Sequence, residues 1–226
     1  MATPPAATSS FTEATLTAVG DIMMHRPQTV AGYNSTEKRY DFDHFFTKVA
    51  ELLSAGDWVV GNLETPLAGA EVGYTGYPRF NAPAALARAL RKAGFNILVT
   101  ANNHTLDQGE AGVLKTLAHI RQEGLHPIGT AANPQEAAQV LIVEKHQIKM
   151  GILAYTYGTN GIPIPGQKDY LVALIDAQRI SKDIAKARQM GADIVTVALH
   201  FGTEYRRTPD AKQKKWVLHC LQAGAD

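Results

Sequence analysis

The feature that most constrains the fold of this chain is a repeated alternation of short apolar runs with helical patterns. Trp58–Val60, Asn96–Val99 and Ile194–Leu199 are apolar runs of a length typical of buried strands. Each run is followed later in the chain by an amphipathic stretch that ends near a glycine, as at Gly94 and Gly124. Strands that alternate with helices in this way predict an α/β fold with largely parallel strand pairing.

The same patterns predict the order of the elements. Strands are expected at Leu16–Val19, Trp58–Val60, Asn96–Val99, His126–Thr130, Val140–Val143, Met150–Tyr155 and Ile194–Leu199, with a hairpin between the fifth and the sixth. Helices are expected at Asp41–Leu53, Ala84–Lys92, Gly109–Glu123, Asp176–Met190 and Ala211–Ala223. Pro27 is expected to stop any regular element, and residues 71–83 and 158–166 are expected to form loops.

A repeated tripeptide marks the end of the chain. Gly191-Ala192-Asp193 leads directly into the strand Ile194–Leu199, and Gly-Ala-Asp recurs at Gly224–Asp226. We therefore expect a further strand after Asp226, so that this α/β fold lacks its C-terminal segment.

Length and composition exclude several classes of protein. The 226 residues, 45% of them hydrophobic, are enough for one well-buried core, which we place at residues 15–226. Residues 1–14 begin with a Pro/Ala/Thr/Ser-rich stretch and are expected to be a disordered leader or linker. The net charge of +1 gives no electrostatic footprint for nucleic acid, and no apolar run approaches the roughly 20 residues that span a bilayer. Because Cys220 is the only cysteine, neither an internal disulfide nor a thiolate metal cluster can form.

Polar side chains follow four of the predicted strands at the point where each strand ends. The groups are Asp21, then Glu64, then Asn102, Asn103, His104 and Asp107, and finally His200 with Glu204. Because the carboxyl ends of parallel strands lie along one edge of a sheet, we expect these groups to converge. Carboxylates, an amide oxygen and imidazoles suit Mn²⁺, Zn²⁺, Fe or Mg²⁺, and a carboxylate that bridges two ions about 3.5–4 Å apart can clamp a phosphate.

Each group also has a structural interpretation when it is taken alone. Asp21 after a strand is a common helix cap or turn residue, Glu64 before Thr-Pro fits a solvated loop, and His200 fits a hydrogen-bonded core histidine. Repetition at four strand ends is what favours a functional site over these alternatives. The other six histidines lack this placement, and all of them except His25 are expected to be structural or solvated; they are His25, His44, His119, His126, His146 and His219.

Five short motifs together resemble a known family, the bacterial CapA (PGA_cap) family. They are Gly20-Asp21-Ile22-Met23, Gly61-Asn62-Leu63-Glu64, Phe80-Asn81-Ala82-Pro83, Ala101-Asn102-Asn103-His104 with Asp107, and His200-Phe201-Gly202 with Glu204-Tyr205. The resemblance extends from about residue 15 to residue 226. It implies a role in poly-γ-glutamate capsule synthesis or export and a relation to calcineurin-like metallophosphoesterases, whose fold is two packed β-sheets flanked by helices.

The resemblance also implies roles for single residues. Asp21, Glu64, Asn103 and His200 correspond to metal ligands, with Glu64 in the place of a bridging carboxylate. His104 corresponds to the catalytic imidazole that acts as general acid towards the leaving oxygen, and we group Asp107 with it. The residues expected to bind substrate are His25, Arg79, Asn81, Asn102 and Glu204.

Three functional hypotheses follow. The first is a metal-dependent hydrolase of a phosphoester or amide bond, acting in capsule synthesis at the extracellular face of the membrane or as a secreted protein. Its partners would be poly-γ-glutamate or a related anionic polymer and the membrane components of the capsule synthase. The second is a non-catalytic accessory whose loop Tyr74–Asn81 binds the polymer, with Arg79 pairing polymer carboxylates. The third is an intracellular phosphodiesterase unrelated to capsule.

Overall fold

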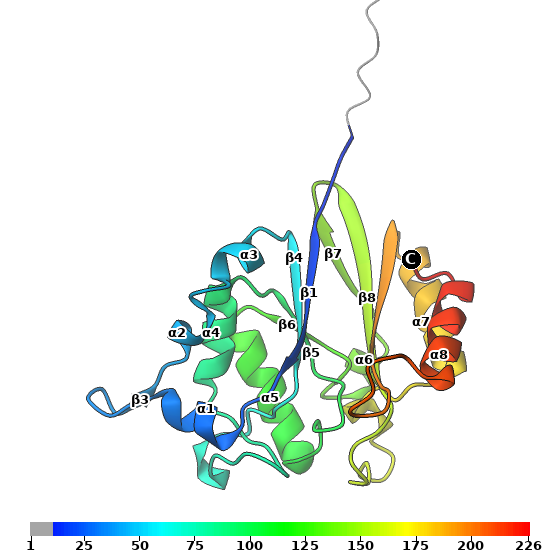
Figure 1. Cartoon of the computed structure of the whole chain (residues 1–226). Coiled ribbons are helices and arrows are strands. Elements are labelled where there is room, and N and C mark those ends of the chain that lie inside the picture. Colours follow the sequence, from blue (N-terminus) through cyan, green and yellow to red (C-terminus); the bar gives the residue numbers. More distant parts are fainter. Residues whose placement is uncertain (1–10) are drawn as a thin grey trace, which may run out of the picture.

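Two β-sheets packed face to face form the centre of the protein, and helices cover both outer surfaces (Figure 1). The computed structural model describes residues 11–226, so most of the expected leader lies outside the described residues. The strands of the first sheet, in spatial order, are β1 (Leu16–Ile22), β4 (Trp58–Leu63), β5 (Ile97–Val99) and β6 (His126–Ile128), all parallel. The second sheet contains β7 (Leu141–Lys145), β8 (Ile148–Thr156) and β9 (Ile194–His200) in that order. The predicted α/β class and the two packed sheets are confirmed.

The helices are short to medium in length. They are α1 (Arg26–Ala31), α2 (Asp43–Phe46), α3 (Ala50–Ser54), α4 (Ala85–Ala93), α5 (Gly109–Gln122), α6 (Pro134–Ala137), α7 (Ala177–Gln189) and α8 (Ala211–Gln222). Single 3₁₀ turns occur at Ala70–Val72 and Asp169–Leu171. No helix within residues 11–226 is both long enough and apolar enough to cross a lipid bilayer.

The apolar runs are continuous because both faces of each sheet are covered. In β4, Trp58 and Val60 pack against the second sheet, while the alternate Val59 packs towards the helices outside the first sheet. In β8, Ile152 faces the first sheet and Tyr155 packs among side chains of α7 and α8. A strand buried on both faces needs apolar side chains in both directions, which explains why these strands read as unbroken runs.

Paired hydrogen bonds set the register of the parallel strands. Asp57 before β4, Asn96 before β5 and Asp193 before β9 each donate the backbone N–H to a carbonyl of the neighbouring strand. The side-chain oxygen of each accepts the N–H of that same neighbouring residue, at 2.8–2.9 Å. Asp226 makes the same two bonds with Val195 of β9. These bonds align the starts of the strands, and hence also the ends that carry the polar groups.

The prediction at Pro27 was wrong. A helix, α1, begins at Arg26 with the proline in its first turn. The first turn of a helix has N–H groups without intrahelical acceptors, so the missing proline N–H costs nothing there.

The helix predicted over Asp41–Leu53 is in fact two short helices, α2 and α3. The chain changes direction between them, so that Phe42 and Leu53 are both buried while Leu52 is 72% exposed. Thr47 and Val49, which lie between the two helices, are β-branched and lower helix propensity. Apolar spacing alone therefore overestimated the length of this helix.

Other local elements were confirmed or missed. The predicted hairpin between β7 and β8 is present, and its turn residues His146 and Gln147 have positive φ angles. The small antiparallel pair β2 (Tyr33–Asn34) and β3 (Arg39–Tyr40) was not predicted. Neither was α6, which has only four residues.

Candidate functional site

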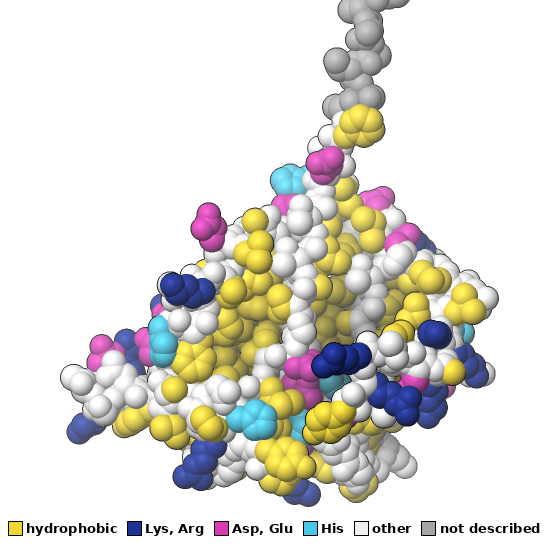
Figure 2. Space-filling view, in the orientation of Figure 1, with side chains coloured by type: hydrophobic (Ala, Val, Ile, Leu, Met, Phe, Trp, Pro, Cys, Tyr) yellow, Lys and Arg dark blue, Asp and Glu magenta, His cyan; other side chains and the backbone are white. Residues whose placement is uncertain are grey.

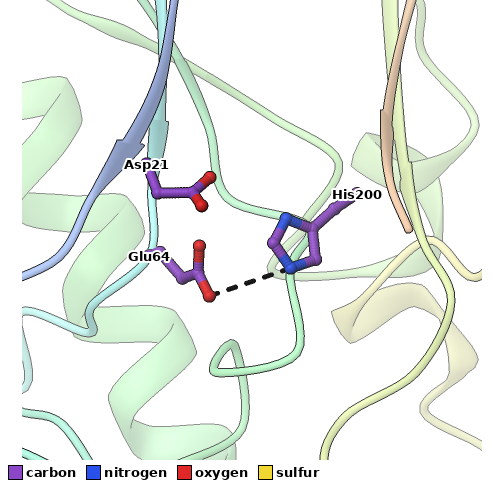
Figure 3. A group of neighbouring side chains, drawn as sticks. All are labelled: Asp21, Glu64 and His200. Atoms are coloured by element: carbon purple, nitrogen blue, oxygen red, sulfur yellow. Dashed lines mark ion pairs between the residues drawn. The ribbon is translucent and has the colours of Figure 1, made fainter. Parts of the chain in front are cut away.

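Three potential metal ligands converge where the two sheets end. Asp21 lies near the end of β1, Glu64 directly follows β4, and His200 is the last residue of β9 in the other sheet. One ligand atom from each lies within 4.8 Å of the others, and the three side chains point towards one another (Figure 3). Asp21, Glu64 and His200 are hereafter called the carboxylate–histidine cluster.

A β-bulge in β1 aligns Asp21 with this cluster. Ala18 pairs with Val60 of β4, whereas Asp21 pairs with Asn62, so β1 carries one extra residue over this interval. A bulge of this kind redirects the side chains that follow it. The extra residue therefore sets which side chain of β1 lies opposite Asn62, and this alignment is not apparent from the alternation of the sequence.

Asn62 is the residue at the centre of the cluster, and it was missed as a site residue. Its amide nitrogen donates to Asp21 Oδ1 at 2.8 Å and Glu64 Oε2 at 3.1 Å, and it lies 3.2 Å from His200 Nδ1. Asn102 orients this amide by donating to Asn62 Oδ1 at 3.1 Å and to the Leu63 carbonyl at 2.9 Å. The position of Asn62 next to a strand end and two residues before Glu64 was the signal that could have identified it.

The acceptors around the Asn62 amide outnumber its hydrogens. One NH₂ group carries two hydrogens and meets three acceptors, two of them carboxylates. Glu64 is 4% exposed, and its burial together with the nearby charges of Asp21 and Glu204 raises the Glu64 pKa to about 8. Burial also lowers the pKa of His200. A buried carboxylate beside a second, exposed carboxylate is costly to ionise without a compensating cation, so Glu64 and Asp21 fit a divalent metal ion.

Asn103 lies beside the cluster and contacts the ring nitrogen Nε2 of His200. Asn103 Oδ1 accepts a hydrogen bond from His200 Nε2 at 2.9 Å, and Asn103 Nδ2 donates to Asn160 Oδ1 at 3.1 Å. His200 Nε2 is 3.8 Å from Glu64 Oε1. The structure thus brings together all four residues that the resemblance implied as ligands.

His104 and Asp107 form a buried pair beside the cluster. His104 Nδ1 donates to Asp107 Oδ2 at 2.7 Å, and the same oxygen accepts the backbone N–H of Phe80 at 2.7 Å. The Phe80 ring contacts the His104 ring edge-on, with centroids 4.7 Å apart. An imidazole oriented by a carboxylate in this way is suited to general acid–base chemistry at its other nitrogen.

The residues expected to bind substrate occupy different positions. Glu204 lines the cleft beside the cluster, and His25 packs edge-on against Phe80, which separates it from His104. Arg79 is exposed on its loop. Asn81 and Asn102 are 0% and 1% exposed, respectively, and the structure does not bring either side chain to the cleft surface.

Both buried asparagines make hydrogen bonds within the protein instead of facing the cleft. Asn81 accepts from the N–H of Ala68 and donates to the carbonyls of Gly69 and Gly73, which pins the loop before Phe80. Asn102 orients Asn62, as described above. An asparagine at a loop or strand end can either contact a substrate or make hydrogen bonds within the protein. Only its burial in the folded structure distinguishes the two roles.

A cleft of about 570 Å³ opens beside the carboxylate–histidine cluster. Its lining includes Asp21, Glu64, Asn103 and His200 together with residues of the loop between β9 and α8. Figure 2 shows acidic, histidine and basic side chains gathered on this face. Arg206, Arg207 and Tyr157 line the cleft and were missed, although a basic pair shortly after a strand end was a usable signal. The Tyr157 ring stacks on His200 with centroids 6.1 Å apart.

Two curated proteins are similar to this chain over most of its length. The capsule biosynthesis protein CapA of Bacillus anthracis is 28% identical over 94% of this chain and 52% of its own length. The PGA biosynthesis protein CapA of Bacillus subtilis (strain 168) is 26% identical over 99% of this chain and 58% of its own length. The chain therefore spans about half the length of the curated relatives it matches.

Solved structures were found that resemble this chain at low sequence identity, and one of them reaches a TM-score of 0.50. The 5′-nucleotidase precursor from Thermus thermophilus superposes with a TM-score of 0.50 and 15% identity, covering 84% of this chain and 37% of that one. The calcineurin-like phosphoesterase YfkN from Bacillus subtilis gives a TM-score of 0.48 and 15% identity, covering 88% of this chain and 65% of that one.

The family model described as "Bacterial capsule synthesis protein PGA_cap" matches residues 15–226. The family expected from the motifs is confirmed: this chain belongs to the bacterial capsule synthesis protein PGA_cap family.

Proposed function

We propose that this chain carries a metal-dependent hydrolase site that acts in the synthesis or export of a poly-γ-glutamate capsule. The observation that supports it is the convergence of Asp21, Glu64 and His200 within 4.8 Å, next to Asn103. The capsule assignment rests on the family and on the printed names of the two CapA relatives.

In this proposal the four converging residues hold one or two divalent ions, of Mn, Zn, Fe or Mg. Such ions act as Lewis acids and lower the pKa of bound water. His104 donates a proton to the leaving oxygen or nitrogen through Nε2, and Asp107 orients the ring through Nδ1. The scissile bond is then a phosphoester or an amide, the two classes that this combination of groups serves.

The cleft supports an anionic substrate. Arg206 and Arg207 line the same cleft as the acids of the cluster, and a guanidinium pairs well with carboxylate or phosphate. Poly-γ-glutamate supplies carboxylates at regular intervals. The corresponding location is the extracellular face of the membrane or the medium, with the membrane components of the capsule synthase as partners.

The test combines metal titration with hydrolysis assays. We expect Mn²⁺ binding by calorimetry, and Mn²⁺-dependent hydrolysis of a chromogenic phosphodiester or of poly-γ-glutamate that EDTA abolishes. Asp21→Asn should lose both properties, while Glu144→Gln, a carboxylate change on an exposed part of β7, should retain them. If wild type binds no metal, or Asp21→Asn behaves as wild type in both assays, the hydrolase proposal is lost.

A second candidate is a polymer-binding accessory without catalysis. The exposure of Arg79 and of Tyr77, which is 76% exposed, favours it, because these side chains present a cation and an aromatic ring to solvent. Retention on immobilised poly-γ-glutamate that survives EDTA but is lost in Arg79→Ala would support this function. Retention that depends on Arg206 and Arg207 instead would favour the cleft.

A further inference from the structure

Asn160 lies next to Asn103, a residue that lines the cleft, in a stretch that the sequence marks only as a loop. Thr159 to Ile162 form a tight turn in which the Ile162 N–H donates to the Thr159 carbonyl at 2.9 Å. Asn160 and Gly161 occupy the two central positions with φ angles of +51° and +75°. Asn-Gly is a favoured pair for such a turn, so turn formation alone is one explanation for this asparagine.

The side chain of Asn160 makes contacts that turn formation does not require. Its Oδ1 accepts a hydrogen bond from Asn103 Nδ2 at 3.1 Å, and its Nδ2 lies 3.5 Å from His104 Nε2. One amide therefore connects a proposed metal ligand to the proposed general acid, two site residues that are adjacent in the chain.

The direction of the bonds in this network follows from the Asp107 carboxylate when the His104 ring is neutral. A carboxylate only accepts, so Nδ1 carries the single hydrogen of the neutral ring and Nε2 faces the Asn160 NH₂ as an acceptor. The protonated ring that acts as the proposed general acid carries a hydrogen on Nε2 as well and gives up this contact. Asn160 consequently presents its oxygen to Asn103. The Asn103 amide must then use its NH₂ group for Asn160, which leaves its oxygen facing His200.

The orientation of Asn103 matters because an amide has two chemically different ends. The oxygen can serve as a ligand to a hard cation, whereas the NH₂ group would repel it. Without an acceptor on the far side, rotation of the Asn103 amide by half a turn would point the NH₂ group at the cluster.

We propose that Asn160 is a positioning residue that holds the Asn103 amide with its oxygen towards the carboxylate–histidine cluster and links that amide to the His104–Asp107 pair. The inference rests on the metal site of the proposed function. Groups that orient metal ligands typically change affinity by about 10–100-fold when they are removed.

The first experiment measures Mn²⁺ affinity by calorimetry in three variants of the whole chain. Asn160→Gly removes the amide but keeps a residue that accepts a positive φ, and we expect the affinity to fall by about 10-fold. Asn160→Asp keeps an oxygen acceptor for Asn103, so it should retain affinity close to wild type. Gln167→Gly is the matched control, because Gln167 is also exposed with a φ of +57°.

Two results would overturn the inference. One is an Asn160→Gly affinity equal to that of Gln167→Gly, and the other is an equal fall in Asn160→Gly and Asn160→Asp. Thermal melts of the metal-free variants check that the turn is intact, since both glycine variants should melt near wild type.

A second experiment needs no metal and separates this inference from the proposed function. In ¹⁵N spectra of the metal-free protein, Asn160→Gly should shift the side-chain amide signals of Asn103 and the ring nitrogen signals of His200 and His104. Gln167→Gly should leave all of them in place. If wild type fails to bind Mn²⁺ but these shifts occur, the metal proposal fails and the positioning role stands; if the shifts are absent, the positioning role is wrong.

Discussion

Two polar clusters lie at different places on the β-sandwich, but only one of them has its carboxylate charge balanced by its own side chains. On the face of the second sheet that α7 covers, Tyr155 donates to Asp183 at 2.9 Å, and Arg179 lies 3.7 Å from the same carboxylate oxygen. We call these three residues the Tyr155 cluster. They line a cleft of about 520 Å³ whose walls come from β6, β7, β8 and α7. The cleft at the carboxylate–histidine cluster is of similar size, at about 570 Å³.

The two clusters differ in whether a positively charged side chain lies near their carboxylates. The Asp183 carboxylate has a guanidinium nearby and a phenol donor, whose pKa is raised by burial and by Asp183. Asp21 and Glu64 share one neutral amide and a histidine whose pKa is lowered. The Tyr155 cluster therefore has the character of a structural ion pair, and the carboxylate–histidine cluster has the character of a site that requires a cation from outside.

The largest expected effect separates chemistry from metal binding within the proposed site. His104→Ala should lower kcat for Mn²⁺-dependent hydrolysis by about 10²–10⁴-fold, the usual contribution of a general acid. Its Mn²⁺ affinity should fall far less, by at most about the 10-fold expected for loss of the Asn160 amide, because His104 is not a member of the cluster and reaches Asn103 only through Asn160. Tyr155→Phe, from the Tyr155 cluster, serves as the control and should leave kcat unchanged. Equal losses in the two variants would remove the distinction between the two clusters.

The next effect concerns pH. The folded-state pKa of Glu64 is raised from 4.5 to about 8, so the folded metal-free protein binds more protons than the unfolded chain between these values. Its free energy of unfolding should therefore fall as the pH rises from about 4.5 to about 8, by at most on the order of 5 kcal/mol. Urea unfolding at several pH values, with EDTA present, measures this slope.

Two variants sharpen the pH comparison. Glu64→Gln cannot ionise and should flatten the slope, whereas Asp183→Asn should leave it as in wild type. Saturating Mn²⁺ should reduce the slope in wild type, because bound cation stabilises the ionised carboxylate. An unchanged slope in Glu64→Gln would falsify the electrostatic account of the cluster.

A smaller but direct effect is expected on metal affinity. Glu64→Gln replaces a charged ligand by a neutral one of the same shape, and we expect Mn²⁺ affinity to fall by about 100-fold or more, since orienting groups alone contribute about 10–100-fold. Asp183→Asn should bind Mn²⁺ as wild type does. Calorimetric titration measures the Mn²⁺ affinity of both variants. Similar losses in both would show that the substitutions act by disturbing the fold and not by removing a metal ligand.

The smallest effect belongs to the Tyr155 cluster. Asp183→Ala leaves the buried Tyr155 hydroxyl and Arg179 without their acceptor, so the free energy of unfolding should fall by about 1–3 kcal/mol. Hydrolysis should persist at a temperature where the variant remains folded. Urea denaturation measures the stability change, and loss of activity in the folded variant would mean that the two clusters are coupled.

Much of the site could be predicted from local sequence. Asp21, Glu64, Asn103 and His200 stand at strand ends that the apolar runs identify. The shared edge of parallel strands brings the first three together, whereas His200 comes from the second sheet. The Asn81 and Asn102 side chains could not be interpreted in the same way. Both lie in the same short motifs as site residues, and their burial depends on segments distant in the chain.

Asn62 and Asn160 show what sequence patterns do not contain. Asn62 matters because its amide nitrogen meets groups from β1, β4 and β9, and a bulge in β1 sets the alignment of Asp21 opposite it. Asn160 is part of an ordinary turn in sequence, yet its amide contacts Asn103 and His104, more than fifty residues earlier. Neither orientation follows from residue type.

The sequence by itself determined the order of the strands and helices, the polar groups at the strand ends, and the family. These features depend on short-range periodicity and on the burial of both faces of each sheet, which are properties of neighbouring residues. Only the tertiary structure decided that His200 crosses from the second sheet to meet Glu64, and which end of each amide faces the cluster. Those choices depend on how the two sheets pack and on the direction of a hydrogen-bond network that begins at one carboxylate, Asp107.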